Sequence, residues 1–597
     1  MTLRQTPLRN AVALFALSAL LFTGGCKRKR KTKSVENTDA YADSLKPLVA
    51  AKTMQGLRWP NFADYEPLVQ TFYDDRNYEV AWIRDGKPTP TALQFIAAFK
   101  DAEHKGLNPE DFDATLWDGR IAKLAGKQDA DIAAYDAAMT VNVMRYISDL
   151  RIGRVNPTHF NFDINTQEKK YDLPEFVSDE AVDATDVPKL IAGVEPDSEQ
   201  YRQTETALAH YLDLAKKQAA MPDLQQPLPT VTKPVSVGGA YPAAGALGKR
   251  LELEGDYTAP PMSQTAGAPM PPNSANVNMQ VYDQALSDGV KSYQDRHSLT
   301  ADGKLTPATI ASLNVPLTDR VIQLQDSLER WRWLPNEYVN APLMVNLPEF
   351  VLRGFGEGHK LDFTMKVVVG KVVGEHQTPV FTHMMKYLIF RPYWNVPMSI
   401  VHKELAGHLD KSGVGYLASH NFEVTNGKGE VQSGFTAKQV EQGQLMVREK
   451  PGPKNSLGLV KFMFPNEYDI YLHSTPQPEL FSRSRRDFSH GCVRVQQPMD
   501  LAVWVLKGQS DKDGDWDMDR VKAAMESGPD NHQVNLKQPI PIVIFYLTAN
   551  VGEDGKTHFF DDIYGYDKQL QEVLAKGMPY PATQQKVNPK TVFGDTN

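Results

Sequence analysis

The residues best suited to covalent chemistry are grouped around one cysteine. The chain has only two cysteines, Cys26 and Cys492, and Cys492 lies in the run Ser489-His490-Gly491-Cys492-Val493-Arg494. A thiol attacks a carbonyl as the thiolate, and a free thiol has a pKa of about 8.5, so a nearby base must take its proton. This segment therefore predicts a cysteine nucleophile for acyl transfer.

Two histidines are candidates for the base. His490 is two residues from Cys492, whereas His473 lies 19 residues earlier in the strand-like segment Ile470-Tyr471-Leu472-His473. Near neighbours on one strand rarely bring their reacting atoms together, so we expect His473 to be the base. The competing interpretation is a buried structural cysteine and a surface histidine.

The remaining residues of the motif suit an oxyanion and a carboxylate. Gly491 lets the backbone approach a substrate closely, so the amides around His490, Gly491 and Cys492 are natural donors to a developing oxyanion. Arg494, two residues beyond Cys492, would share its face of a strand and could hold a carboxylate with two parallel hydrogen bonds. Tyr471 shares a face with His473 in the same way.

Neither metals nor nucleic acid are expected partners. His402, Glu404 and His408 do not have the spacing that places two zinc ligands on one helical face. Asp511, Asp513 and Asp515 depart from the calcium-loop pattern at its glycine and at its last ligand, and are interpreted as a turn and cap before a helix near Asp519. The formal net charge of −8 lacks the basic footprint of a nucleic-acid-binding protein. We expect no cofactor.

The N-terminus has the features of an export signal. Arg4 and Arg9 precede a short apolar run from 11 to 22, small residues follow, and then Cys26. Residues 1–25 resemble a bacterial lipoprotein signal peptide, which would make Cys26 the lipidated first residue, although an ordinary signal cleaved near Gly25 is the alternative. The basic run 27–33, within a tether over 26–40, would add attraction to anionic lipid. Lipidation would leave Cys492 as a lone exported thiol, which favours a chemical role for it.

The periodicity of the chain predicts a multidomain α+β protein. Residues 41–220 are interpreted as a helical scaffold, with apolar stripes such as the one in Tyr201 to Ala215. In this region Thr91 is expected to cap a helix through Phe95 and Phe99. A Pro-rich linker is expected over 221–244, followed over 245–315 by three short helices, one of which begins at Thr306-Pro307. A second Pro-rich stretch, 259–273, interrupts this small domain.

Beyond the small domain the pattern becomes strand-like. Alternation in 363–369 and short apolar runs at 343–347, 387–390, 458–464 and 470–473 predict a mainly-β domain over 316–510 that carries the chemistry. Residues 404–455 are longer, polar and Gly-rich, and are expected to form a lid over the site. Residues 511–597 are expected to be a separate C-terminal segment with a helix and one buried strand at 542–547.

The motif resembles that of the YkuD-type L,D-transpeptidases, in particular the long-chain YcbB-like branch. The resemblance rests on Ile470-Tyr471-Leu472-His473 and Ser489-His490-Gly491-Cys492-Val493-Arg494, with Pro392-Tyr393-Trp394-Asn395 and Arg330-Trp331-Arg332-Trp333 in the same order. The three-helix segment, with Leu299-Thr300-Ala301-Asp302-Gly303, resembles a peptidoglycan-binding domain.

The resemblance implies a reaction and roles for individual residues. Cys492 would attack a peptidoglycan tetrapeptide stem, release its terminal D-Ala and pass the acyl group to an amine of a second stem, which gives a 3→3 cross-link. His473 would be the base, oriented by a backbone carbonyl near Ser474, and Tyr471, Trp394, Ser489 and Arg494 would contact the donor stem. The protein would lie in the periplasm, anchored through Cys26 to lipid of the outer membrane, with other cell-wall synthases as candidate partners.

Two other functions use the same sequence features. Water in place of the acceptor amine would give a carboxypeptidase or endopeptidase with the same residues. A wall-binding structural lipoprotein with an inactive site is the second alternative, and the intact pair of Cys492 and His473 argues against it.

Overall fold

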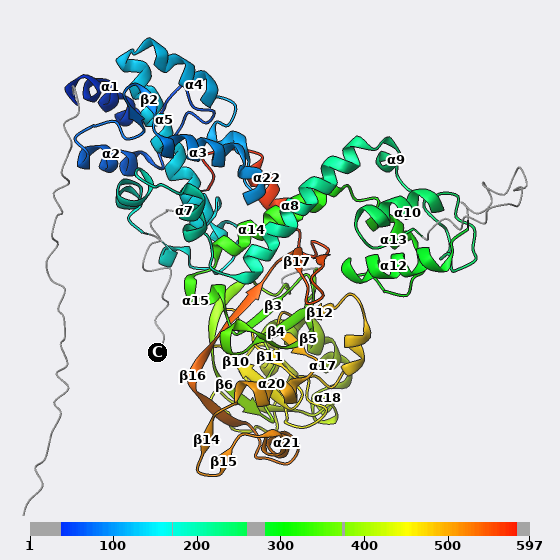
Figure 1. Cartoon of the computed structure of the whole chain (residues 1–597). Helices are drawn as coiled ribbons and strands as arrows, with labels where there is room; N and C mark the ends of the chain where they lie inside the picture. The colour runs from blue at the N-terminus through cyan, green and yellow to red at the C-terminus, as the bar shows by residue number, and fades with distance from the viewer. Residues whose placement is uncertain (1–37, 170, 260–280, 373–375, 582–597) are drawn as a thin grey trace, which may run out of the picture.

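The computed structural model describes residues 38–169, 171–259, 281–372 and 376–581 (Figure 1). The predicted signal segment 1–25, all but the last residues of the 26–40 tether, and residues 260–273 of the Pro-rich insertion lie outside these ranges. In the described part of the chain, buried apolar side chains form separate clusters in a helical N-terminal region, a small helical domain, a mainly-β domain and a subdomain attached to it. The predicted multidomain α+β architecture is confirmed.

The N-terminal region is helical because long apolar stripes bury one or more faces of its helices. Its central helix, α5, spans Asp129–Ile152 and is buried along most of its length. Thr89, and not Thr91, caps α3, because Pro90 occupies the first helical turn and the Thr89 side chain accepts the Ala92 N–H. The other helices of this region are α1 (Thr38–Ala50), α2 (Glu66–Asp75), α4 (Trp117–Lys123), α6 (Leu173–Phe176) and α7 (Val187–Val194).

Two long helices connect the parts of the molecule. α8 (Glu199–Ala220) packs along α14 (Leu317–Trp333), and both contact strand β17 (Ala549–Val551) of the β domain (Figure 1). The expected stripe of α8 is buried. Trp331 and Trp333 are buried in the core. None of the helices in the described ranges is long and apolar enough to cross a bilayer.

The small domain contains helices α10 (Ala244–Leu253), α12 (Gln284–Arg296) and α13 (Pro307–Leu313), after the short α9 (Pro222–Gln225). Thr306 caps α13 through the Thr309 N–H, as predicted. The proposed linker is partly wrong, because Leu228 and Tyr241 are buried in the core of this domain. Part of residues 221–244 is therefore a structural component of the domain.

The β domain is a sheet that closes on itself. The strand order is β12-β5-β13-β11-β10-β6-β16-β3-β4, and β4 also pairs with β5. The strands are β3 (Leu343–Asn346), β4 (Val351–Phe355), β5 (Leu361–Gly370), β6 (Phe381–Phe390), β10 (Val460–Met463), β11 (Leu472–His473), β12 (Asp487–Ser489), β13 (Val493–Val495) and β16 (His532–Phe545). Closure removes exposed sheet edges and encloses an apolar core.

The C-terminal residues are not a separate segment, which corrects the expected boundary at 511. β16 lies between β6 and β3, antiparallel to the first and parallel to the second. α21 (Met518–Glu526) begins after Asp517, whose side chain accepts the Arg520 N–H. Removing the residues after 510 would therefore remove a central strand of the β domain.

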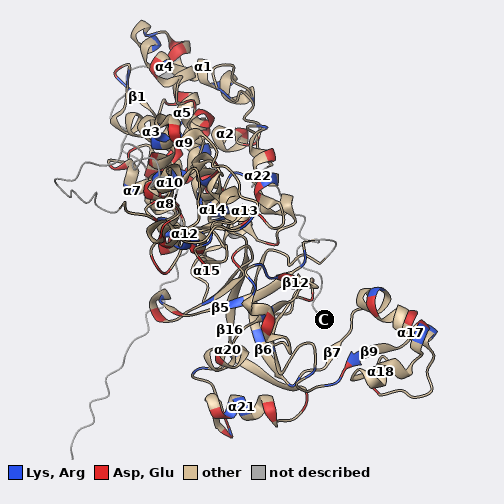
Figure 2. Ribbon diagram, turned by 90° about the vertical axis from the view of Figure 1, so that its right-hand side faces the viewer, with Lys and Arg blue, Asp and Glu red and all other residues tan. Residues whose placement is uncertain are grey.

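The expected lid is a small folded unit that begins earlier than 404. Strands β7 (Trp394–Asn395), β9 (Met446–Glu449) and β8 (Phe422–Thr425) form its sheet, and Val401, Leu409 and Val440 contribute to its core. Figure 2 shows this unit, with α17 (Ala406–Ser412) and α18 (Gly415–Ser419), projecting from the closed sheet. We call residues 394–449 the lid subdomain.

Candidate active site

Three neighbouring strands of the closed sheet bring the chemical groups together. Lys461 on β10 is the register partner of His473 on β11, and His473 is the partner of Arg494 on β13. Register partners present their side chains on the same face of a sheet, so these three side chains form a row across the strands. Tyr471 and Cys492 lie two residues before His473 and Arg494, immediately ahead of β11 and β13, and therefore belong to the same face.

The Cys492 thiol is only partly buried, at the start of β13. Its sulfur donates to the backbone oxygen of Asp469 over 3.6 Å. Gly491 precedes it with φ of +124°, a conformation that favours glycine. Burial raises the pKa of the Cys492 thiol to about 11, and hydrogen bonds with Tyr471 and the charge of Lys461 offset part of that rise.

His473 is buried and neutral at physiological pH. Burial, the charge of Arg494 and, more weakly, that of Lys461 lower the pKa of His473 to about 3. Its Nδ1 lies 2.5 Å from the backbone oxygen of Ser474. A carbonyl only accepts, so Nδ1 carries the proton and Nε2 is the unprotonated, basic nitrogen. The contact expected of Ser474 is therefore present, and its orienting role stays a prediction.

Cys492 and His473, both described residues, share a face but are not hydrogen-bonded to each other in this structure. The thiol donates to the Asp469 backbone oxygen. The ring of Tyr471, which immediately precedes β11, lies 5.8 Å from the ring of His473. Catalytic hydrogen bonds are often loose before substrate binds. The nucleophile and base roles remain predictions that this arrangement permits.

In the loop before Cys492, the Gly491 amide was expected to donate to an oxyanion, but it has another partner. The Gly491 N–H donates to Ser489 Oγ over 3.1 Å, so it does not face a substrate, and Ser489 acts on the loop itself. The Gly491 carbonyl accepts from Thr378 Oγ1 over 2.6 Å. The loop is thus fixed from both sides of Gly491, and the expected oxyanion role of the Gly491 amide is not met in this structure.

His490 contacts the lid subdomain. Its Nε2 lies 2.6 Å from Glu404 Oε1, and its ring meets that of His376 edge to face at 5.0 Å. Both His490 and Glu404 are partly exposed, so this hydrogen bond contributes little stability, on the order of 0–1 kcal/mol. It nevertheless links the lid subdomain to the Cys492 loop.

The predicted donor-pocket residues Arg494 and Trp394 belong to different parts of the fold. Arg494 reaches Gln477 Oε1 over 2.9 Å, and its buried Nε has no acceptor among the described residues. Trp394 lies on β7 and packs against the core of the lid subdomain. Its contact with substrate is therefore a prediction that depends on the position of that subdomain.

Several residues that support the site were not identified from the sequence. Tyr564 donates to the Gly370 carbonyl over 2.7 Å, beside Thr378, and Thr378 in turn holds the Cys492 loop. Lys461, Asp469 and Glu404 were missed as well, because their relation to Cys492 appears only when separate strands and loops are paired.

The groups considered for metals have other partners. His402 Nε2 contacts the Glu441 carbonyl at 2.7 Å, and His408 stacks on Tyr416. Asp511 pairs with Arg520 at 2.6 Å, and the acids form a hairpin, β14 (Ser510–Asp511) with β15 (Gly514–Asp515). In the ranges that the structure describes, no three His, Cys, Asp or Glu side chains are grouped to hold a metal ion.

Comparisons with known proteins agree with the geometry. Residues 342–521 match the family model described as the L,D-transpeptidase catalytic domain, YkuD, and residues 272–313 match a putative peptidoglycan binding domain. Residues 67–208 match a scaffold domain. A "Putative L,D-transpeptidase" of Haemophilus influenzae is 28% identical over 281 residues, which cover 46% of this chain and 55% of that protein. The assignment to a YcbB-like branch stays a prediction.

Proposed function

Because residues 342–521 form an L,D-transpeptidase catalytic domain of the YkuD type, we propose that the chain forms 3→3 peptidoglycan cross-links through a thioester on Cys492. The observation that carries the proposal lies in that domain. Cys492, Tyr471 and a neutral His473 share one face of adjacent chain segments, and the Nδ1 contact of His473 with the Ser474 carbonyl leaves the unprotonated nitrogen at Nε2.

In the first step the Cys492 sulfur attacks the carbonyl that joins the third residue of a tetrapeptide stem to D-Ala. His473 Nε2 takes the thiol proton and returns it to the leaving nitrogen, so that D-Ala departs as a neutral amine and a thioester remains. In the second step an amine of another stem attacks the thioester carbonyl. His473 accepts its proton and the thiol is regenerated.

The tetrahedral intermediates need a donor for the oxyanion. The Gly491 amide is occupied by Ser489 Oγ, so we infer that the Cys492 amide is the backbone donor. We infer that Arg494, whose buried Nε has no acceptor among the described residues, receives a stem carboxylate by a planar contact.

The remaining parts of the chain suit an exported cell-wall enzyme. The domain that matches at 272–313 would bring the enzyme to peptidoglycan. We place the protein in the periplasm, with Cys26 lipidated and held in the outer membrane, because an apolar run and small residues precede that cysteine.

The experiment combines detergent-solubilised full-length protein with disaccharide-tetrapeptide and follows the products by mass spectrometry. We expect an acyl adduct on Cys492, release of D-Ala and a cross-linked dimer. Cys492→Ala should lose all three while keeping its circular dichroism spectrum, and His473→Ala should lose them nearly completely. His490→Ala should lose less, because His490 contacts the lid subdomain.

The products also separate the alternatives. D-Ala release without dimer would indicate hydrolysis, with water as the acceptor. A folded wild-type protein that forms no adduct would indicate a wall-binding protein with an inactive site and would refute the proposal.

A further inference from the structure

The base predicted for this site has a cationic residue on each side. In the row across the sheet, His473 lies between Lys461 on β10 and Arg494 on β13. The row continues to Ile389 on β6 and Val368 on β5, which are apolar. Lys461 and Arg494 are thus the two charged members of this row.

The Lys461 ammonium is held close to the nucleophile without an acid to neutralise it. It lies 5.4 Å from the centroid of the Tyr471 ring, and Tyr471 is hydrogen-bonded to Cys492. In the described part of the chain, neither Lys461 nor Arg494 forms an ion pair with a carboxylate within 4.0 Å. Burial lowers the pKa of Lys461, and its interaction with Cys492 opposes that change.

A partly buried cation is costly unless a negative charge accompanies it. Apart from the second cation, Arg494, the side chains that share its face are a thiol, a phenol and an imidazole, and these are neutral in the resting site. Of these, the thiol is the group that becomes an anion during acyl transfer. Removal of its proton would give the Lys461 ammonium a counter-charge.

We propose that Lys461 is a positioning residue of this site, whose ammonium stabilises the Cys492 thiolate and opposes a second positive charge on His473. The inference rests on the proposed function of Cys492 as nucleophile. In this arrangement the fixed cations Lys461 and Arg494 balance the negative charge of the thiolate. The His473 imidazolium then carries the proton only transiently.

Other charged or titratable groups face the same residues. β11 contributes Tyr471 and His473, β13 contributes Arg494, β6 contributes Tyr387, β5 contributes Lys366, and the loops contribute Asp469 and Glu479. Asp469 raises the pKa of Cys492, and so opposes Lys461. A change at Lys461 removes one of the cations and leaves the remaining groups in place.

The test measures the reactivity of Cys492 toward iodoacetamide between pH 6 and pH 10 in the full-length protein. The variants are Lys461→Met, Lys461→Arg and, as the matched control, Lys386→Met on the exposed face of β6. Below the thiol pKa, a rise of one unit lowers the thiolate fraction tenfold. We therefore expect Lys461→Met to slow alkylation about tenfold at pH 8, Lys461→Arg to restore it to within about threefold, and Lys386→Met to leave it unchanged.

A second measurement separates charge from packing. The His473 ring titration, followed by NMR, should move to higher pH in Lys461→Met, because a nearby cation is lost, and should return toward the wild-type value in Lys461→Arg. Equal loss of alkylation in the Met and Arg variants, or unchanged alkylation in Lys461→Met, would overturn the inference. Alkylation requires no peptide stem, so these results are independent of whether wild-type protein forms cross-links.

Discussion

At the scale of single residues, the predicted nucleophile and the predicted base are both uncharged in the absence of substrate. Burial raises the pKa of the Cys492 thiol and lowers that of His473, so the two are a thiol and a neutral imidazole at pH 7. Such a pair protects the Cys492 thiol from oxidation, because the thiolate is the reactive species. The thiolate must then be generated when a substrate is bound.

The pH dependence of thiol reactivity follows from these two pKa values. The thiol pKa of about 11 lies above the measured range, so the thiolate fraction should rise about tenfold with each pH unit. We expect the rate of iodoacetamide reaction at Cys492 to increase continuously from pH 6 to pH 10. Mass spectrometry of the Cys492 peptide measures it, and a plateau starting near neutral pH would show a stable thiolate–imidazolium pair instead.

At the scale of elements, short connections decide how His473, the predicted base, is oriented. Gly458 precedes β10 with φ of +62°, and a Cβ there would lie 2.4 Å from Ser474 Oγ and 2.8 Å from the Thr475 nitrogen. The Ser474 carbonyl contacts His473, so the turn at Gly458 and the position of the base are coupled. Position 458 therefore favours glycine for two reasons: the backbone is left-handed there, and Ser474 lies too close for a Cβ atom.

A pair of glycine variants separates these two requirements. Gly508 has φ of +74° and no atom within 4 Å of its Cβ position, so Gly508→Ala has only the backbone cost, roughly 1–2 kcal/mol. We expect Gly508→Ala to keep the rate of acyl-enzyme formation within about twofold. Gly458→Ala has a similar backbone cost and also displaces Ser474, so its rate should fall tenfold or more. Equal rates in the two variants would argue against an orienting role for Ser474.

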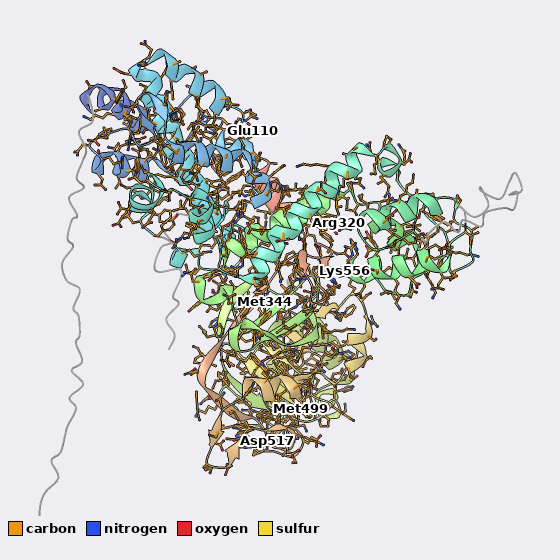
Figure 3. All side chains as sticks on the ribbon, in the orientation of Figure 1. Glu110, Arg320, Met344, Met499, Asp517 and Lys556 are labelled. Carbon is orange, nitrogen blue, oxygen red and sulfur yellow. The ribbon has the colours of Figure 1, made fainter. Side chains whose placement is uncertain are left out.

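At the scale of the whole molecule, buried charges join the domains. Arg296 of the small domain donates to Tyr211 of α8 over 3.0 Å and to the Thr557 carbonyl of β18 (Thr557–Phe559) over 3.1 Å. It also pairs with Glu254 and Asp256 within its own domain. Figure 3 labels Lys556 next to this junction, and Lys556 Nζ donates to Ser292 Oγ over 2.9 Å. The small domain is therefore fixed to both α8 and the β domain.

Removing Arg296 should loosen this junction without changing the active site. Breaking one partner of a buried ion pair costs about 3–5 kcal/mol, because the other charge is left uncompensated. We expect Arg296→Met to increase protease cleavage between the small domain and the β domain, while Cys492 alkylation stays unchanged. Lys291→Met, at an exposed position of the same helix, is the control. Unchanged cleavage in Arg296→Met would show that other contacts hold the domain.

Attachment to a membrane through Cys26 is a prediction at the same scale. Acyl chains contribute about 0.8 kcal/mol per buried methylene, and the basic run 27–33 adds attraction to anionic lipid. We expect Cys26→Ala to shift the protein from the membrane fraction to the soluble fraction of cells, measured by immunoblotting. A protein that stays with the membrane after this change would have another anchor.

The sequence by itself determined the features that depend on near neighbours. The alternation in β5, the buried stripe of α8 and the cap at Thr306 follow from local periodicity and short-range hydrogen bonds, and the Cys492 segment showed its chemistry through residue types within six positions. The same kind of cap signal is present at Thr89-Pro90, but the helix start was predicted at Thr91. Leu228 was assigned to a linker because of the composition around it, although it is a core residue of the small domain.

Only the tertiary structure decided which distant segments meet. β16 enters the sheet beside β3, roughly 200 residues earlier, Tyr564 supports the Gly370 turn, and Glu404 reaches His490. Strand order and register come from long-range backbone hydrogen bonds and from burial of both sheet faces. The local periodicity of the sequence does not show which distant strands will pair. For that reason the row of Lys461, His473 and Arg494, which sets the charge around the base, became visible only in the folded chain.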